Sequence, residues 1–311
     1  MLQQPTKSQS LQALDALKRR GELSQVNQST FHRLTSGYQG EQLFYNLLKK
    51  GLHSHPITLF DIQLNIQGGT CQIDAMLIFQ HEILLFEVKN FNGEYVIQDD
   101  RWYTLDKKSI RNPLHQLQRT ELLLQQYFNS QQVILPVKSY LIFIHPEFTL
   151  YNAPHNLPII LPSQLNRFIR QLDNIPCRIG EQHHDISRLL RSNHSQVSPF
   201  EQAIEFTEDT LKTGILCEKC SGTMEEYNLR KVSCPHCSRV EDFAPAIFRG
   251  IEDFYYLFPN RQITVKNIYD WLHHSVSKHK IRKTLSSKLT KEGSGRGTHY
   301  VFKEDILVSD N

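Results

Sequence analysis

Two acidic residues and one lysine lie at the outer ends of two neighbouring apolar segments in the first third of the chain. The segments are separated by the polar link Gln80-His81, which has the length of a two-residue β-turn. In a hairpin of this register Asp74 faces Glu87, and Lys89 shares a face with Glu87 because side chains alternate along a strand. Directly opposed Cβ atoms in such a hairpin are ~4.5–5.5 Å apart. The pattern therefore predicts two carboxylates and an ammonium group at one end of a β-hairpin.

A divalent cation would relieve the repulsion between two carboxylates that lie so close together. Mg²⁺ takes oxygen ligands and keeps several of its waters, so two protein carboxylates are enough to hold it. Such an ion, Mg²⁺ or Mn²⁺, polarises a phosphoryl oxygen and lowers the pKa of a bound water, which is the chemistry of phosphodiester hydrolysis. Lys89 would orient that water or offset the charge that builds on the phosphate. Glu41, on a predicted helix, would add a further carboxylate.

The same residues also fit simpler structures. An Asp, a Glu and a Lys on one face can form a salt-bridged surface cluster. A one-residue β-bulge would turn Asp74 to the opposite face of the hairpin. The spacing alone leaves these alternatives open beside the metal site.

Short sequence motifs occur in order along the chain around the predicted hairpin. Across residues 37–145 they are Gly40-Glu41, Gly68-Gly69, Gln72-Ile73-Asp74, Glu87-Val88-Lys89-Asn90, Gly93, and Asn112-Pro113 followed by Gln116. Together they resemble the nuclease-related domain (NERD) family of the PD-(D/E)XK nuclease superfamily, with Ile73 standing where that superfamily loosely keeps a proline. The resemblance implies an α/β fold with a restriction-endonuclease-like core, in which helices flank a mixed sheet.

The resemblance also implies a role for each residue of the site. Glu41, Asp74, Glu87 and the Val88 carbonyl would bind the divalent ion. Lys89 would be the catalytic lysine, and Gln116 would lie near the substrate phosphate or the attacking water.

Four of the six cysteines fall in two Cys-x-x-Cys pairs with the spacing C-x2-C-x13-C-x2-C: Cys217, Cys220, Cys234 and Cys237. Two such pairs can offer four thiolates to one Zn²⁺ ion in a closed structural site, and the segment resembles a zinc ribbon. A redox dithiol is the alternative, although one pair would suffice for that. A saturated zinc site leaves no position for catalysis, so we expect it to support the fold or a partner surface.

The C-terminal segment is strongly basic. Residues 261–303 carry ten basic and two acidic side chains, a net charge of +8 in a chain whose total is +3. Predicted helices at residues 263–274 and 277–289 precede the glycine-rich residues 293–297, and this order resembles a winged helix-turn-helix. Its second helix would lie in the major groove of DNA, with a solvated lysine-rich helix as the alternative. The predicted phosphate contacts are Lys278, Lys280, Arg282, Lys283, Lys288 and Arg296.

Apolar periodicity predicts the elements that must position these residues. Helices are expected at residues 11–20, 36–51 and 113–128, and strands at residues 57–66, 71–79, 83–89, 95–98 and 137–144. This order is typical of an α/β domain. The predicted parts are a polar, partly helical extension (1–34), the nuclease-like domain (35–150), a connecting segment (151–212), the zinc ribbon (213–245) and the winged-helix-like basic domain (246–311).

The composition fits a folded cytoplasmic protein. Hydrophobic residues make up 39% and charged residues 22%, which excludes a mainly disordered chain. No uncharged apolar stretch reaches the ~18 residues of a membrane span, and the N-terminus lacks the apolar core of a signal peptide. We therefore expect no membrane partner.

The sequence thus predicts a metal-dependent nuclease that acts on nucleic acid, with DNA as the expected substrate. The two C-terminal modules would help it to bind. The alternative is a non-catalytic DNA-binding or regulatory protein that keeps an inactive nuclease fold as a scaffold.

Overall fold

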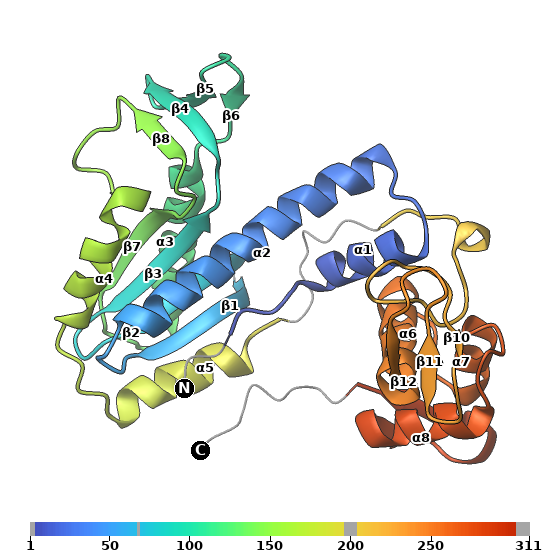
Figure 1. The fold of residues 1–311 in the computed structure, drawn as a ribbon. Coiled ribbons are helices and arrows are strands. Elements are labelled where there is room, and N and C mark those ends of the chain that lie inside the picture. The colour runs from blue at the N-terminus through green and yellow to red at the C-terminus, as the bar shows by residue number, and fades with distance from the viewer. Residues whose placement is uncertain (1–3, 67–68, 196–203, 303–311) are drawn as a thin grey trace. The chain divides into compact units, whose positions relative to one another are not determined.

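The computed structural model describes residues 4–66, 69–195 and 204–302 (Figure 1). Within these residues the chain forms two compact units. Of the described residues, the first comprises 4–6, 33–66 and 69–195, and the second comprises 7–32 and 204–302. None of the described helices has both the length and the apolar character needed to cross a membrane.

A five-stranded mixed sheet forms the centre of the first unit. Its strands, in spatial order, are β1 (Ile57–Ile66), β2 (Gly69–Ile78), β3 (Ile83–Lys89), β7 (Val137–Phe143) and β9 (Ile159–Ile160). Neighbours from β1 to β3 are antiparallel, whereas β3, β7 and β9 run parallel. The carboxyl ends of β3 and β7 therefore meet at one edge of the sheet.

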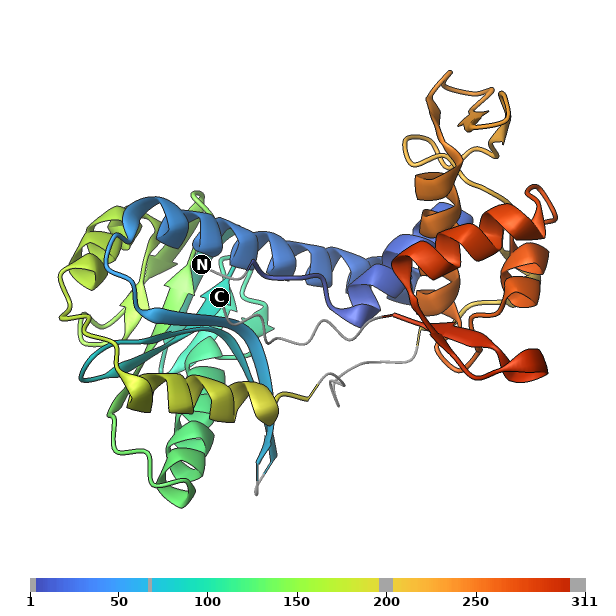
Figure 2. The same cartoon turned by 90° about the horizontal axis from the view of Figure 1, so that it is seen from below.

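Helices cover both faces of this sheet (Figure 2). On one face, α2 (Gln25–Gly51) and α4 (Leu165–Asp173) pack through Phe44, Leu48 and Phe168 against the alternate side chains of β2 and β3. On the other, α3 (Pro113–Ser130) and α5 (Glu181–Ser192) pack against the opposite set of side chains. The predicted α/β class, a mixed sheet flanked by helices, is confirmed.

A second, smaller sheet follows β3 in the chain. It consists of β6 (Ser109–Ile110), β5 (Arg101–Thr104), β4 (Gly93–Gln98) and β8 (Phe148–Tyr151) in spatial order, with β4 and β8 parallel. The fully buried Trp102 stacks on Phe143 and anchors this sheet to the end of β7. Of these strands, the sequence predicted only β4.

Two stretches differ from the predicted parts. The supposed connecting segment 151–212 contains η1 (Pro162–Gln164), α4 and α5, and both α-helices pack into the core of the first unit. Four apolar residues of α4 at helical spacing, Leu165, Phe168, Ile169 and Leu172, are all buried. The supposed extension 1–34 contains the predicted helix as α1 (Gln9–Arg20), and α2 already begins at Gln25.

Helix α1 is an internal part of the second unit. It packs against α6 (Phe243–Leu257), where Arg20 and Asp253 form an ion pair with both side chains only 1% exposed. Arg20 also donates to the carbonyl oxygens of Lys212 and Gly214. Because breaking such a pair leaves an uncompensated buried charge, α1 cannot be a freely moving extension.

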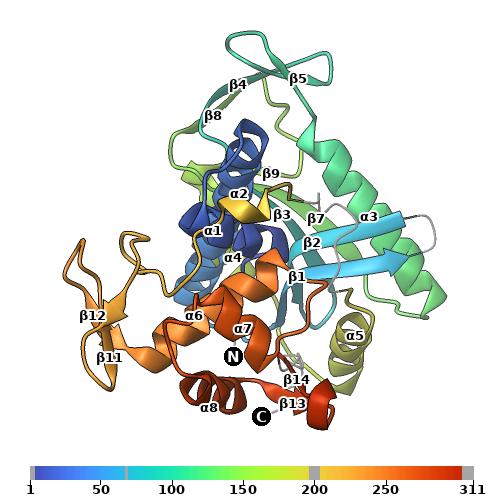
Figure 3. The ribbon, with the colours of Figure 1, turned by 90° about the vertical axis from the view of Figure 1, so that its right-hand side faces the viewer.

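The rest of the second unit is helical with two small sheets (Figure 3). After η2 (Glu208–Thr210), the strands β10 (Glu225–Glu226), β11 (Lys231–Ser233) and β12 (Val240–Asp242) form an antiparallel sheet. Beyond α6 follow α7 (Val265–Trp271), α8 (Lys278–Lys288), β13 (Thr290–Glu292), η3 (Gly295–Gly297) and β14 (His299–Val301). Ile263 forms an isolated bridge with Tyr300 of β14.

Candidate active site and candidate metal centre

The hairpin of β2 and β3 has the predicted register. Met76 pairs with Leu85, and the last pair toward the site is Ala75 with Phe86. Beyond it the strands stop exchanging backbone hydrogen bonds, and the Asp74 carboxylate accepts one from the Val88 amide at 2.8 Å. Asp74 is thereby fixed next to the strand that carries Glu87, and no bulge in β2 turns it away.

Glu87, Lys89 and Gln116 form a mutual hydrogen-bonded contact. Lys89 Nζ donates to Glu87 Oε1 at 2.5 Å, and Gln116 Nε2 donates to the same oxygen at 2.7 Å. Lys89 Nζ also donates to Gln116 Oε1 at 3.2 Å. The Glu87 side chain is 3% exposed and that of Lys89 is 20% exposed, so solvent reaches the group from the lysine side.

The start of α3 explains why Gln116 arrives at this place. The Asn112 carboxamide oxygen accepts a hydrogen bond from the Leu114 amide, and Pro113 occupies the first turn. Asparagine at the N-cap and proline at the first helical position both favour helix initiation. The helix therefore begins at a defined residue, which directs Gln116 toward the end of β3.

Gly40 allows α2 to approach the end of β3 closely. A Cβ atom at this position would lie 2.9 Å from the Cβ of Asn90, the residue after Lys89. Glu41 follows directly and is brought near the other carboxylates. Burial and the charge of Asp74 raise the pKa of Glu41 to about 9. Burial and the charge of Glu87 raise the pKa of Asp74 to about 8.

Asp61 is a fourth carboxylate of this region, which no sequence motif indicated. The β1–β2 ladder pairs Phe60 with Ala75 and Ile62 with Ile73, so Asp61 lies opposite Asp74 without pairing. Its backbone is left-handed, with φ of 49°, and its carboxylate accepts a hydrogen bond from Gln72. Burial raises the pKa of Asp61. Its only signal is the long-range register between β1 and β2, which no local pattern in the sequence determines.

The donor set fits a divalent cation. Burial and neighbouring carboxylates raise the pKa of the half-buried Glu41 and of the buried Asp74, and the Lys89 ammonium and the Val88 amide offset part of this effect. Oxygen ligands of this kind suit Mg²⁺ or Mn²⁺ rather than a softer metal. Among the described residues, the carboxylate oxygens of Glu41, Asp74 and Glu87 do not all lie within 4.8 Å of one another.

Stability in the absence of the cation should fall as the pH rises. Glu41 and Asp74 keep their protons to about pH 9 and 8 in the folded protein but lose them near pH 4 when unfolded. The folded state then binds more protons, so the free energy of unfolding decreases between these limits. Without added Mg²⁺ or Mn²⁺, the unfolding temperature of the wild type should drop more steeply from pH 5 to 9 than that of Glu41→Gln. If the unfolding temperatures of the two proteins fell equally steeply with pH, the raised pKa of Glu41 would be contradicted.

The four cysteines of the second unit converge. Their sulfur atoms all lie within 4.8 Å of one another, with 3.5 Å between Cys217 and Cys237 and 3.4 Å between Cys220 and Cys234. These distances exceed the ~2.05 Å of a disulfide. They approach the edge of a tetrahedron with metal–sulfur bonds of ~2.3 Å. The cluster can therefore hold one tetrahedrally coordinated metal ion.

Both Cys-x-x-Cys pairs adopt the same turn. Ser221 donates its amide to the Cys217 carbonyl and Ser238 donates to the Cys234 carbonyl, each at 2.9 Å. Both serines have left-handed backbones. A Cβ at Gly222 would approach the His236 ring to 2.5 Å, so the two turns pack tightly. The sequence-equivalent turns present their thiolates toward a common centre.

The predicted phosphate-binding residues divide into two groups. Lys278, Lys280 and Lys288 lie over the rings of Tyr269, Phe243 and Phe248. Arg282 and Lys283 are exposed on α8, and within the described part of the chain neither has an ion pair or ring contact. The Arg296 side chain lies outside the described residues. The five described cations thus differ in their surroundings on α8, and their contacts with DNA phosphates remain a prediction.

Comparison with known families relates the first unit to nucleases. Residues 36–144 match the family model described as "Nuclease-related domain". The match covers about a third of the chain and contains Glu41, Asp74, Glu87, Lys89 and Gln116, but not the cysteines or α8. No curated protein and no solved structure matches the chain. The first unit thus carries a nuclease-related domain.

Proposed function

We propose that this protein is a metal-dependent nuclease that hydrolyses phosphodiester bonds in DNA. The main support is the contact among Glu87, Lys89 and Gln116 beside the buried Asp74 and the half-buried Glu41. The nuclease-related domain over the same residues supports a nucleic-acid substrate. The cytoplasmic location expected from the sequence remains a prediction.

Mg²⁺ or Mn²⁺ would be held by Asp74, Glu87, Glu41 and the Val88 carbonyl. When bound, such an ion polarises the phosphoryl group and lowers the pKa of a coordinated water. Gln116 holds the Glu87 carboxylate through a 2.7 Å hydrogen bond. Lys89 brings a positive charge to the solvent-accessible side of the group, where it can stabilise charge developing on a phosphate.

The second unit would contribute structure and affinity. We propose that Zn²⁺ occupies the four-cysteine cluster as a closed structural site. The exposed cations of α8 would contact DNA phosphates in the manner of a winged helix, since α6, α7 and α8 are followed by a two-stranded hairpin. Such contacts strengthen binding without reading sequence.

One observation favours the non-catalytic alternative. Lys89 already neutralises Glu87 at 2.5 Å, and Glu41 and Asp74 hold protons near neutral pH because their pKa values are raised. The group is therefore electrostatically tolerable without a metal ion, as a scaffold would require. A DNA-binding or regulatory protein would bind DNA in a salt-dependent way without cutting it.

A cleavage assay separates the two functions. The purified full-length protein is incubated with supercoiled plasmid, linear duplex and single-stranded DNA, with Mg²⁺, Mn²⁺ or no added ion. A nuclease nicks or cuts at least one substrate only when the ion is present. Binding to DNA with no cleavage in any of these combinations would reject the nuclease and leave the scaffold.

The phosphate contacts of α8 predict a specific salt dependence. Arg282→Gln combined with Lys283→Gln should weaken DNA binding and reduce the slope of log K against log salt by about 1 to 2, because each neutralised phosphate contributes about 0.9. Lys49→Gln with Lys50→Gln removes the same charge from an exposed stretch of α2 and serves as the control. Equal slopes for the two double variants would remove α8 from the DNA interface.

A further inference from the structure

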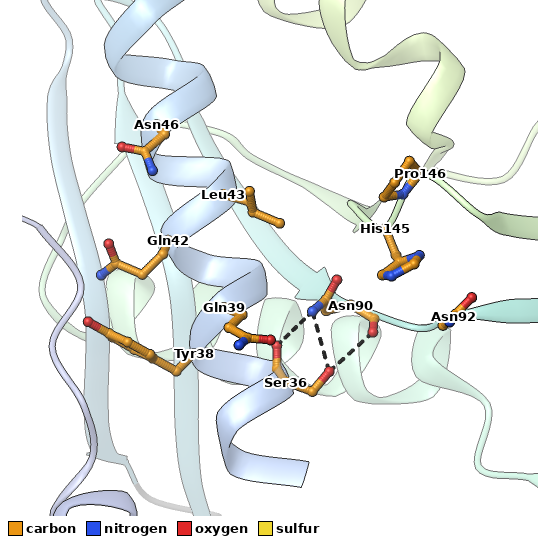
Figure 4. A pocket seen from close by; sticks show the side chains of 10 residues that line it. All are labelled: Ser36, Tyr38, Gln39, Gln42, Leu43, Asn46, Asn90, Asn92, His145 and Pro146. Carbon is orange, nitrogen blue, oxygen red and sulfur yellow. Dashed lines mark hydrogen bonds between the residues drawn. The ribbon is translucent and has the colours of Figure 1, made fainter. Parts of the chain in front are cut away.

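A pocket of 540 Å³ lies next to the carboxylate site in the first unit. Asn90, directly after Lys89, forms part of its wall, and α2 contributes residues on both sides of Glu41 in the sequence. Asn90 and His145 follow the carboxyl ends of the parallel strands β3 and β7, the edge where α/β sheets commonly bind ligands. Figure 4 shows its residues, which include Ser36, Gln39, Leu43, Asn90, Asn92 and His145.

The lining is rich in carboxamides. Five of the ten residues around the pocket are asparagine or glutamine, and the described lining includes no Lys, Arg, Asp or Glu. Without a cationic side chain the pocket is poorly suited to a phosphate. Carboxamides present a donor and an acceptor side by side, which is the pattern that matches the edge of a nucleobase.

Asn90 supplies a hydrogen-bond acceptor that has no partner. Its amide nitrogen donates to the Ser36 carbonyl at 3.0 Å and contacts the Ser36 hydroxyl at 3.4 Å. The reverse orientation of the amide would set two carbonyl oxygens against each other. Within the described residues, Asn90 Oδ1 is buried and accepts no hydrogen bond. In Figure 4 this oxygen points between Leu43 and His145.

Apolar and ring surfaces flank that oxygen. Leu43 is 45% exposed, and the His145 ring lies across from it with Pro146 alongside. Unstacked bases bind to proteins by packing on rings and apolar side chains while polar groups take their edges. Rotation of the half-exposed Leu43 would give an entering base access to the Asn90 oxygen.

We propose that this pocket holds one unstacked nucleobase of a single-stranded DNA segment whose adjoining phosphate lies at the carboxylate site. The base donates an N–H group to Asn90 Oδ1, as the exocyclic amino groups of adenine and cytosine can. This inference rests on the proposed function for the position of the phosphate. It makes single-stranded or locally opened DNA the preferred substrate, since a base inside a duplex is not free to enter.

Binding of short oligonucleotides tests the pocket without relying on cleavage. The probes are fluorescein-labelled single strands of seven nucleotides, with thymine at every position except the centre, which carries adenine, cytosine, thymine or an abasic residue. Fluorescence anisotropy with Mg²⁺ gives the affinity for full-length protein carrying Glu87→Gln, so that cleavage cannot mimic release. The pocket variant adds Gln39→Ala, Leu43→Ala and Asn46→Ala, all exposed on α2.

A matched control adds Gln118→Ala, Leu122→Ala and Gln126→Ala, which are exposed at similar spacing on α3. The parent and the control should bind the adenine or cytosine probe about tenfold more tightly than the abasic probe. The pocket variant should bind these probes almost equally. The proposal would be overturned if the parent bound the adenine, cytosine and abasic probes equally. It would also be overturned if the pocket variant kept the parent's ratio of affinities between the base-containing and abasic probes. Failure of the wild type to cut DNA would instead reject the nuclease and leave this measurement intact.

Discussion

Glu87→Ala and Lys89→Ala should each lower the metal-dependent rate of DNA cleavage by about a hundredfold to a thousandfold. Glu87 is a proposed metal ligand and the acceptor for both Lys89 and Gln116. Lys89 is the cation that offsets charge on the reacting phosphate. The measurement is the initial rate of plasmid nicking at saturating Mg²⁺ or Mn²⁺, with the unfolding temperature recorded for each variant.

A second ion pair on the same sheet provides the control for this experiment. Lys138 Nζ lies 2.5 Å from Glu82 Oε2 at the other end of the β2–β3 hairpin. Glu82→Ala and Lys138→Ala remove a pair of the same length and charge far along the strands from Asp74. They should leave the cleavage rate within about twofold of the wild type. Cleavage that persists in both Glu87→Ala and Lys89→Ala would exclude the proposed site.

Lys89→Ala and Glu87→Ala should also differ in their effect on binding of the divalent ion. Lys89→Ala removes the cation beside Glu41, Asp74 and Glu87, so the pKa values of Glu41 and Asp74 should rise further. The variant should bind a divalent ion no less strongly. Glu87→Ala removes a carboxylate and should weaken ion binding. Titration of Mn²⁺ against the rate therefore separates the two roles, because only Glu87→Ala should require more metal ion.

The β2–β3 hairpin was predictable because its signal is local. Alternating apolar residues on both sides of Gln80-His81 determine the turn and therefore the pairing of Met76 with Leu85. The site residues Asp74, Glu87 and Lys89 follow from the same alternation. Helix α3 was equally predictable from local sequence, since Asn112 and Pro113 are residues that favour the start of a helix.

Other parts had no comparable local signal. Asp61 lies near Asp74 because the register of β1 against β2 places the two positions opposite each other. No periodic pattern in the sequence predicts the left-handed backbone of Asp61. The second sheet depends on parallel pairing between β4 and β8, which are distant in the sequence. Helix α1 was predicted as an element, but its place in the second unit depends on the pair of Arg20 with Asp253, far apart in the chain.

Removal of the metal ion from the four-cysteine cluster should unfold the second unit. Cys217 and Cys234 are buried in the same core cluster as Met224, Val232 and Ile247 of the surrounding elements. Structural zinc in small domains contributes about 10–16 kcal/mol of apparent binding free energy at pH 7. A whole domain has a net stability of only about 5–15 kcal/mol. The core around the cluster should therefore not persist without the ion.

The two tryptophans allow each unit to be followed separately. Trp271 lies in the core of the second unit and Trp102 in that of the first, and the chain has no other tryptophan. In a Trp102→Phe background, Cys217→Ser or treatment with a strong chelator should shift Trp271 emission to that of a solvent-exposed indole. In a Trp271→Phe background, the same treatments should leave Trp102 with its buried emission. Elemental analysis should find about one zinc per chain before treatment and none afterwards.

Cys177→Ser controls for the loss of a thiol, because Cys177 lies in the first unit outside the cluster. It should retain the zinc and the Trp271 emission. A protein that contains no metal as purified, keeps Trp271 buried and forms two disulfides reversibly would instead support the redox alternative. Retention of the folded second unit in both Cys217→Ser and chelated protein would show that the apolar core alone stabilises it. The closely spaced sulfur atoms argue against that outcome, because without an ion the buried thiols of Cys217 and Cys234 would have only weak hydrogen-bond partners.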